Sequence, residues 1–596
     1  MKNDRIENGS YSNFSFIDAY KMNIKKIIPI LEWLPNYTTS RFRGDFIAGI
    51  TVGIILIPQG IAYALIAGLP PIYGLYTALV PQLMYAIFGS SRQVAIGPVA
   101  MDSLIVAAGV STLALAGSDS YIEIAILLAL MVGTIQLLMG VFRLGFIVNF
   151  LSKPVISGFT SAAALIIGFN QFRNLFGVDF ERSNQIQYVI IDIWKNISSL
   201  SINTTVIGIV ASIIILVLRK VNKKIPNALI VVILGIVAVK YFGKSFEDVA
   251  IIKEVPSGLP SFGVPEIDID QLKELMPIVL TLVLVGFLET ISIGKSLESK
   301  QDEYRIRPNQ ELVALGLGNI VGSLFKAYPS TSSFSRSAIN QESGATTGMA
   351  ALVSIGMVVI TLLFLTPVFY YLPKTILAAI IIVAVFGLVN VTEARHLRKT
   401  NNLDFWLLIT TFIATLFLGI EYGIFAGVGL SIVILIFRIS KPYIAVLGAV
   451  PDSDFYKNSD RFKHVIIEDD VLIIRFDAQL FFANSSYFRD NLDELADKKG
   501  KALKLIVIDA ESINRADSTG AEMLMERISY YKKRGITFYL AGVKGPVRDT
   551  LFRAGILNII DLDHFFMNIY TAVKFYKTGD REHQKKYAEY IHHTYK

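Results

Sequence analysis

Long apolar segments dominate the chain, and they are too hydrophobic for the surface of a soluble domain. Between Asp45 and Ser440 the sequence contains stretches such as Tyr121–Val141 that carry almost no charge, whereas charged residues gather in residues 1–45 and 451–596. A helix needs about 20 apolar residues to cross the hydrocarbon layer. The sequence therefore predicts a membrane-embedded part that ends near residue 440 and a soluble part that follows it.

Residues 45–440 provide roughly 28 residues per pass if the chain crosses the membrane about fourteen times. Lys and Arg concentrate on the cytoplasmic side of membrane proteins. Four basic clusters all follow even-numbered spans, which predicts that both termini are cytoplasmic: Arg219/Lys220/Lys223/Lys224, Lys295–Arg307, Arg395/Arg398/Lys399 and Arg438/Lys441. The expected spans begin near Asp45, Tyr73, Gly97, Tyr121, Gly145, Thr205, Asn227, Pro277, Pro308, Ser332, Gly348, Thr375, Asp404 and Tyr422.

The composition disfavours several other classes of protein. The net charge is +7, but the basic residues form short clusters between apolar runs, so we expect no nucleic-acid partner. Cysteine is absent, and no two of the six histidines outside the pair His592/His593 have metal-ligand spacing on one helix face, so we expect no metal site. We also find no nucleophile and base in a catalytic context, and we expect neither an enzyme nor a cofactor other than a coupling ion.

Two of the expected spans are short and interrupted. Residues 97–110 begin with Gly97-Pro98, and residues 332–343 follow Pro329 and a run of Ser and Thr. Such segments suit half-helices, because Pro is favoured in a first turn and hydroxyl groups cap free amides. They are the third and the tenth span, which is the third position of each half. Paired broken helices of this kind predict inverted repeats with a binding site at the membrane midplane.

Arg336 is the only charged residue between Lys326 and Glu342, inside the second interrupted span. A charge at this depth is costly unless it is paired or faces water, so it marks a functional site. A guanidinium beside free helix amides favours an anion. The alternatives are an arginine that snorkels to the membrane surface or one that forms a structural ion pair with Glu289.

Glu289 lies in the otherwise apolar part of the eighth span, with Ser292 and Ser296 on the same helix face. We expect it to be a coupling group for a proton or Na⁺, and the alternative is a structural ion-pair partner. Gln59 and Tyr63 share a helix face just after Pro58, where a bend exposes polar groups. Either could donate a hydrogen bond to an oxyanion, or both could instead join neighbouring helices.

After about residue 451 the pattern changes to that of a compact α/β domain. Residues 471–476, 503–509 and 536–543 read as strands, and residues 518–534 and 547–554 as amphipathic helices. The expected division is a cytoplasmic segment at 1–44, a transport domain at 45–440, an α/β domain at 441–578 and a charged tail at 579–596.

Several motifs resemble those of the sulfate permease (SulP) family. They are Ile57–Tyr76, Phe88–Gln93, Ile96–Pro98, Gly258–Pro260 and Ser333–Ser337, and in the C-terminal part Arg475–Asn484 and Asp517–Gly520, which resemble the STAS domain of that family. The resemblance covers essentially the whole chain. It implies fourteen spans as seven plus seven inverted repeats, core and gate domains, and an elevator-like motion.

The same resemblance implies an anion held between the amino ends of spans three and ten. Carried over by motif, the pocket residues are Gln59, Tyr63, Val99, Ala100, Phe334, Ser335 and Arg336, and Glu289 stands where the family usually has an acidic residue. Ser518 and Thr519 resemble the loop that is phosphorylated in anti-sigma factor antagonists, so we expect a regulatory role. The alternative is an ordinary helix start capped by Asp517 or Ser518.

These observations predict a secondary active transporter of a small anion, with sulfate favoured and bicarbonate or a dicarboxylate as alternatives. Glu289 without an obvious second carboxylate favours proton symport. Na⁺ symport, anion exchange, channel-like conduction and a non-transporting sensor remain open. We expect a multi-pass protein of the inner (plasma) membrane, a homodimer, and a cytoplasmic partner for the STAS domain.

Overall fold

The computed structural model describes residues 24–150, 152–180, 183, 185–221, 227–241, 248–298, 304–387 and 389–580. The chain separates into two compact units, Met1–Ser431 and Ile432–Lys596. The predicted domain limits at residues 45, 441 and 579 stay predictions, and most of the expected charged tail lies outside the described residues.

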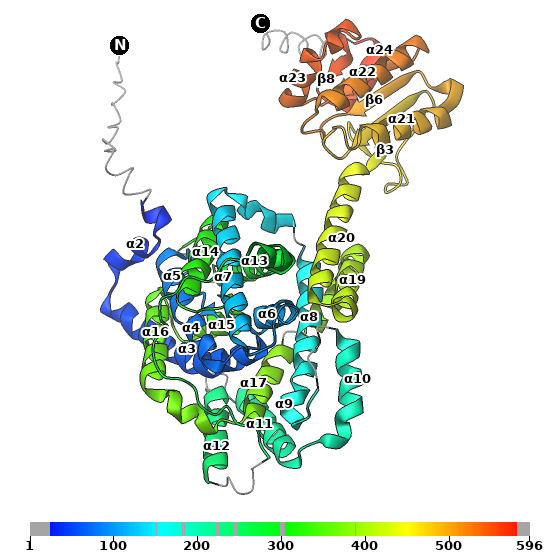
Figure 1. Ribbon diagram of the computed structural model, residues 1–596. Helices are drawn as coiled ribbons and strands as arrows, with labels where there is room; N and C mark the ends of the chain where they lie inside the picture. Colours follow the sequence, from blue (N-terminus) through cyan, green and yellow to red (C-terminus); the bar gives the residue numbers. More distant parts are fainter. Residues whose placement is uncertain are drawn as a thin grey trace, which may run out of the picture. The chain divides into compact units, whose positions relative to one another are not determined.

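The first unit consists of helices and two very short strands (Figure 1). Its elements, in chain order, are α2 (Ile30–Trp33), α3 (Thr39–Ile66), α4 (Pro71–Thr77), α5 (Val80–Phe88), β1 (Ile96–Gly97), α6 (Ala100–Val110), α7 (Asp119–Val141), α8 (Lys153–Asn170), α9 (Phe172–Phe176), α10 (Ile186–Asn196), α11 (Ile202–Val221), α12 (Asn227–Tyr241), α13 (Ile269–Glu298), α14 (Pro308–Leu324), β2 (Thr331–Ser332), α15 (Phe334–Glu342), α16 (Met349–Ile360), α17 (Lys374–Phe386), α18 (Val391–Thr400), α19 (Asn402–Leu418) and α20 (Ile420–Ser440), the last of which continues into the second unit.

Each of the fourteen expected spans has a helical counterpart among these elements, in the expected order. Within the described residues, eight helical segments are long and apolar enough to cross a membrane, and three shorter apolar helices accompany them. The two spans expected to be broken are α6 and α15, with 11 and 9 residues. Each of these helices follows a two-residue strand, so the third span of each half is built in the same way.

The fifth expected span begins later than the sequence pattern indicated. Residues 144–150 form a 3-10 helix, and α8 begins only at Lys153, with Pro154 in its first turn. Proline suits this position because its missing N–H would have no partner there. The preceding apolar residues had hidden this boundary.

Close helix packing in the first unit depends on small residues. A Cβ atom at Gly49 on α3 would lie 2.5 Å from the carbonyl oxygen of Ala350 on α16, and one at Gly53 would lie 2.9 Å from the Cβ of Met357. Such distances leave no room for a side chain. The backbones of the two helices therefore approach each other more closely than larger residues would allow.

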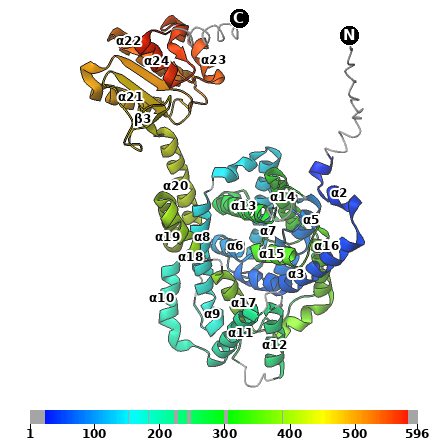
Figure 2. The ribbon, with the colours of Figure 1, turned by 180° about the vertical axis from the view of Figure 1, so that it is seen from behind.

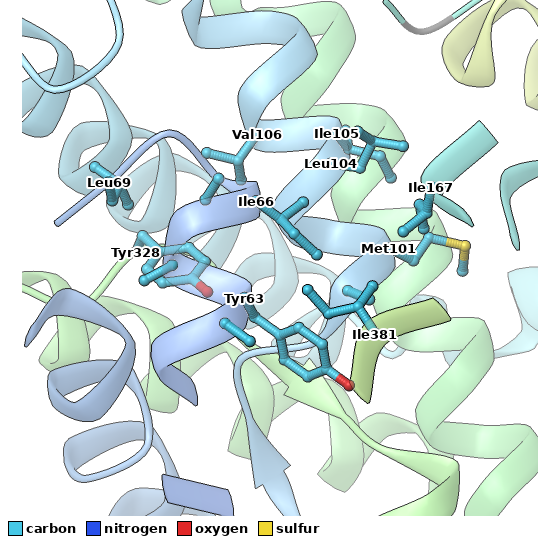
Figure 3. Packing of buried hydrophobic residues seen from close by; sticks show 14 of the residues in the cluster. Tyr63, Ile66, Leu69, Met101, Leu104, Ile105, Val106, Ile167, Tyr328 and Ile381 are labelled. Carbon is cyan, nitrogen blue, oxygen red and sulfur yellow. The ribbon is translucent and has the colours of Figure 1, made fainter. Parts of the chain in front are cut away.

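A buried apolar cluster extends through the first unit, and Figure 3 shows part of it. Ile66 from α3, Leu104 from α6, Ile167 from α8 and Ile381 from α17 meet there, together with the ring of Tyr63. Side chains from both halves of the unit therefore fix α6 in place, and α6 is one of the two broken helices.

The second unit is an α/β domain around a six-stranded sheet (Figure 2). The strand order is β4-β3-β5-β6-β7-β8; β5 to β8 are parallel, and β3 pairs antiparallel with β4 and β5. Its elements are β3 (Ile444–Ala449), β4 (Tyr456–Asn458), β5 (Val471–Phe476), α21 (Ser485–Lys499), β6 (Leu505–Asp509), α22 (Ser518–Lys533), β7 (Thr537–Ala541), α23 (Gly545–Arg553), β8 (Phe565–Phe566) and α24 (Ile569–Thr578).

The three expected strands correspond to β5, β6 and β7, and the two expected helices to α22 and α23. The sequence pattern did not indicate β3, β4, β8, α21 or α24. β3 lies before residue 451, where the α/β pattern becomes clear in the sequence, and β8 has only two residues. Neither therefore stands out as a separate strand.

The Gly49 contact predicts the effect of a single methyl group. Gly49→Ala should lower the stability of the purified protein in detergent by about 1–3 kcal/mol, the usual cost of overpacking, and should lower its Tm. Gly356→Ala on α16 is the matched control, because a Cβ atom there would have nothing within 4 Å. Equal Tm values for the two variants would contradict the close packing of α3 on α16.

Candidate anion-binding site

Two distant segments cross between the amino ends of α6 and α15. β1 pairs antiparallel with β2, with Ile96 opposite Ser332 and Gly97 opposite Thr331. The amide of Ser333 also donates to the carbonyl of Ala95 at 3.0 Å. Because the strands are antiparallel, the chain leaves them in opposite directions into α6 and α15. The amino ends of the two helices thus face each other across the strand pair, where free N–H groups favour an anion.

Arg336 lies in the first turn of α15 and is 0% exposed. Its Nη1 donates a hydrogen bond to Oε1 of Gln59 at 3.2 Å, while Nε and Nη2 are buried without a hydrogen-bond partner. The guanidinium also lies beside β1, because a Cβ atom at Gly97 would be 3.4 Å from its Nη2. The side chain therefore reaches from α15 across to the segment that precedes α6.

The surroundings of Arg336 exclude both alternatives that the sequence left open. Complete burial is incompatible with a side chain that snorkels to the membrane surface. Within the described residues, no ion pair involves Arg336, and its only side-chain hydrogen bond is the one to Gln59. A buried cation with two unused donors is costly, and an anionic guest would supply the missing acceptors.

The structure brings Gln59 and Tyr63 to the same place. Both are buried on α3, one turn apart, after the internal Pro58. Gln59 accepts from Arg336, so its amide group can turn its own N–H donors toward a guest. In Figure 3 the Tyr63 ring lies beside Met101 and Ile381, with its hydroxyl group at the margin of the cluster.

The remaining expected pocket residues lie at the two helix starts. Val99 precedes α6 and is partly buried, and Ala100 is its first residue. Phe334 and Ser335 open α15, and both are exposed. Ser333 accepts from the amide of Arg336 at 3.5 Å, whereas Val99 offers α6 no side-chain cap. The first amides of α6 are therefore not satisfied by a preceding side chain.

Glu289 lies on the face of α13 that contacts β2. On the same face, the carbonyl oxygen of Gly286 accepts from Thr331 at 3.0 Å, and the Thr290 hydroxyl donates to Ser332 at 2.9 Å. Oε2 of Glu289 is buried without a hydrogen-bond partner. Glu289 is thus close to the strand crossing, but the described residues show no ion pair between it and Arg336.

Asp102 is a second carboxylate that the sequence interpretation missed. It lies in the first turn of α6, is 2% exposed, and its Oδ1 is buried without a hydrogen-bond partner. It follows β1, whose partner strand β2 is hydrogen bonded to α13, the helix of Glu289. The rule that singled out Arg336, a charge inside a short apolar half-helix, applies equally to Asp102 and could have found it.

In the second unit, Asp517 caps α22. Its Oδ1 accepts from the amide of Gly520 at 2.8 Å, and its Oδ2 accepts from the amide of Phe482 at 3.0 Å. The structure therefore contains the helix cap that the sequence offered as an alternative. Ser518 and Thr519 are exposed beside it, so their hydroxyl groups are accessible, and their regulatory role stays a prediction.

Comparison with known families decides the class of the chain. Residues 42–411 match the sulfate permease family, and residues 463–572 match the STAS domain. The chain belongs to the sulfate permease family. It is a multi-pass membrane protein that transports anions, and its relatives are transporters rather than enzymes.

Similar proteins include "Sulfate transporter 4.1, chloroplastic" of Arabidopsis thaliana, which is 38% identical and aligns over 92% of this chain and 82% of its own length. "High affinity sulfate transporter 2" of Stylosanthes hamata is 33% identical, over 95% of this chain and 89% of its own length.

Among solved structures, the overall structure of SLC26A9 superposes with a TM-score of 0.87 at 25% identity, covering 98% of this chain and 99% of that one. The transmembrane domain of the cyanobacterium bicarbonate transporter BicA gives a TM-score of 0.58 at 21% identity, covering 66% of this chain and 99% of that one. These likenesses confirm the predicted fold class, a helical membrane domain followed by a STAS domain, and the fourteen-span inverted repeat fits the family.

Proposed function

We propose that this protein is a secondary active transporter of sulfate, and that it binds the anion between the amino ends of α6 and α15. The observation that carries the proposal is the burial of Arg336 with two guanidinium nitrogens unpartnered at this place. A tetrahedral oxyanion presents several acceptor oxygens, and a guanidinium can bind two of them at once. Gln59, Tyr63 and the first amides of both helices would complete the set of donors.

Sulfate is proposed as the substrate because the curated relatives named above are sulfate transporters. The donors agree with this choice, because Arg336 supplies a positive charge and the other donors are neutral. The likeness to the bicarbonate transporter supports the fold alone, so bicarbonate and dicarboxylates serve as competitors in the test. An elevator-like movement of one part of the membrane domain against the other is the proposed transport mechanism.

Proton symport is the proposed coupling mode. Glu289 supports it, since this carboxyl group lies on the α13 face that contacts the strand crossing and has an oxygen without a partner. A buried carboxyl group can carry a proton across the membrane together with the anion. We further propose a homodimer in the inner (plasma) membrane with both termini cytoplasmic and with a cytoplasmic partner for the STAS domain.

Arg336→Ala should abolish most sulfate transport. Loss of a hydrogen bond to a charged group costs about 1.5–3 kcal/mol, which corresponds to a loss of affinity of roughly 10–150-fold. The measurement is uptake of radiolabelled sulfate into proteoliposomes, with unlabelled sulfate, bicarbonate and a dicarboxylate as competitors. Arg395→Ala, at an exposed arginine of α18, is the matched control. Uptake by Arg336→Ala equal to that of the control would remove Arg336 from the mechanism.

Glu289→Gln should separate transport from its driving force. If Glu289 carries the coupled proton, uptake by this variant should not respond to an imposed pH gradient, because glutamine cannot be protonated in this range. The test is a series of uptake measurements across pH, with Glu123→Gln, an exposed carboxylate of α7, as the matched control. An unchanged pH dependence in Glu289→Gln would refute proton coupling through this residue.

A further inference from the structure

Asp102 is a buried charged residue at the amino end of α6 that the proposed function does not use. It lies two residues after Ala100, in the first turn of the α6 helix whose amino end would hold the anion. A carboxylate in a first turn is attracted to the same free amides as a bound anion. An ionised Asp102 would therefore both compete with the anion for the helix end and repel it.

Packing places Asp102 and Glu289 on neighbouring helices. α6 lies against α13, where Gly109 contacts Ile278 so closely that a side chain at Gly109 would clash with it. Asp102 follows β1, which pairs with β2, and Glu289 lies one turn after Gly286, which accepts a hydrogen bond from Thr331 of β2. Each carboxyl group has one buried oxygen without a hydrogen-bond partner. Two carboxylates that share one site out of water are not both stable as anions, because repulsion adds to the loss of hydration.

Within the described residues, neither Asp102 nor Glu289 forms an ion pair. The Tyr328 hydroxyl forms a hydrogen bond of 3.0 Å with Ser103, the residue after Asp102, and carries no positive charge. Arg336 on α15 bonds to Gln59 on α3.

In the part of the chain that the structure describes, charged groups on other helices packed against α6 and α13 also form no ion pair with Asp102 or Glu289. Asp119 and Glu123 on α7 and Lys153 at the start of α8 are exposed. On α14, Glu311 accepts from Tyr85 and from the amide and hydroxyl of Ser90.

We propose that Asp102 and Glu289 form one shared proton-binding site, and that a proton on this pair is what allows the anion to bind at the amino end of α6. This inference rests on the proposed function and deepens it, because it names the partner of Glu289 and the route of coupling. Protonation removes a negative charge from the first turn of α6 and leaves the helix amides to the anion. The free energy of coupling is then the electrostatic repulsion between an ionised pair and the anion, and by linkage the bound anion favours the protonated pair.

The test is the affinity for sulfate of the purified full-length protein at mildly acidic and mildly alkaline pH. The wild type should bind sulfate about tenfold more weakly at the alkaline value, a factor within the usual range for coupled sites. Asp102→Asn should lose most of this difference and keep the tighter affinity at both values, because asparagine leaves no charge on α6. If the role of Asp102 were purely structural, Asp102→Asn would instead weaken sulfate binding equally at both pH values.

The control variants separate the inference from the proposed function. Asp119→Asn changes an exposed carboxylate at the start of α7, and this variant should behave like the wild type. Asp102→Glu restores a carboxyl group and should restore the pH dependence. The double variant Asp102→Asn/Glu289→Gln should lose no more of the pH dependence of sulfate affinity than either single variant, because the two residues act as a unit. Wild-type pH dependence in Asp102→Asn would overturn the pair while leaving Glu289 as a proton carrier.

A second measurement does not depend on sulfate. A hydrophobic carbodiimide reacts with protonated carboxyl groups, and mass spectrometry identifies the labelled residue. In the wild type, labelling at Asp102 or Glu289 should fall as the pH rises, and Asp102→Asn should move the decline at Glu289 to lower pH, because the repulsion is gone. An unchanged labelling profile of Glu289 in Asp102→Asn would overturn the proposed pair. Sulfate binding that requires Na⁺ and does not depend on pH would overturn it as well. Failure of the wild type to bind sulfate, with the predicted labelling intact, would instead overturn the proposed substrate alone.

Discussion

A guanidinium buried without a countercharge is the constraint on which the membrane domain depends. Removing an unpaired cation from water costs several kcal/mol, and the fold meets only part of this cost through the single hydrogen bond from Arg336 to Gln59. The helix amides around the strand crossing add partial positive charge at the same place. The protein tolerates this concentration of unused donors where a negatively charged guest would bind.

The surrounding architecture holds these donors in fixed positions. The β1–β2 pair joins two segments that are more than two hundred residues apart in the sequence, and it sets the distance between the two helix starts. The hydrogen bonds from Thr331 to Gly286 and from Thr290 to Ser332 attach α13 to this pair. Glu289 follows Gly286 by one turn of α13, and Asp102 follows β1 in the first turn of α6. A change in the charge of these carboxylates would therefore act directly on the helix end that the anion needs.

Part of the site could be predicted from sequence because it rests on local chemistry. Arg336 is a charge in an apolar setting, and Pro, Gly and Ser mark the two short helices, so both features are visible in a single window. Asp102 carries the same signal, since it is a charged residue within the short apolar segment 97–110. The sequence interpretation, which found no obvious second carboxylate for Glu289, therefore missed Asp102.

The rest of the site depends on contacts between distant segments. A pair of two-residue strands has no sequence pattern of its own, so β1 and β2 could not be foreseen. The rotation of α13 about its axis was equally undetermined. An ion pair between Glu289 and Arg336 consequently remained plausible until the structure showed Arg336 bonded to Gln59. In the STAS domain, the buried strands β5 to β7 were predictable because they are short runs rich in β-branched, aromatic and other apolar residues, whereas β3 lies before residue 451, where this pattern becomes clear.

The most direct test is a density map of the full-length protein in the presence of selenate, an oxyanion of the same shape and charge as sulfate with a stronger scattering atom. The account predicts density between the amino ends of α6 and α15, with oxygens at about 2.7–3.2 Å from the guanidinium of Arg336. Density elsewhere, with Arg336 still bonded only to Gln59, would contradict it.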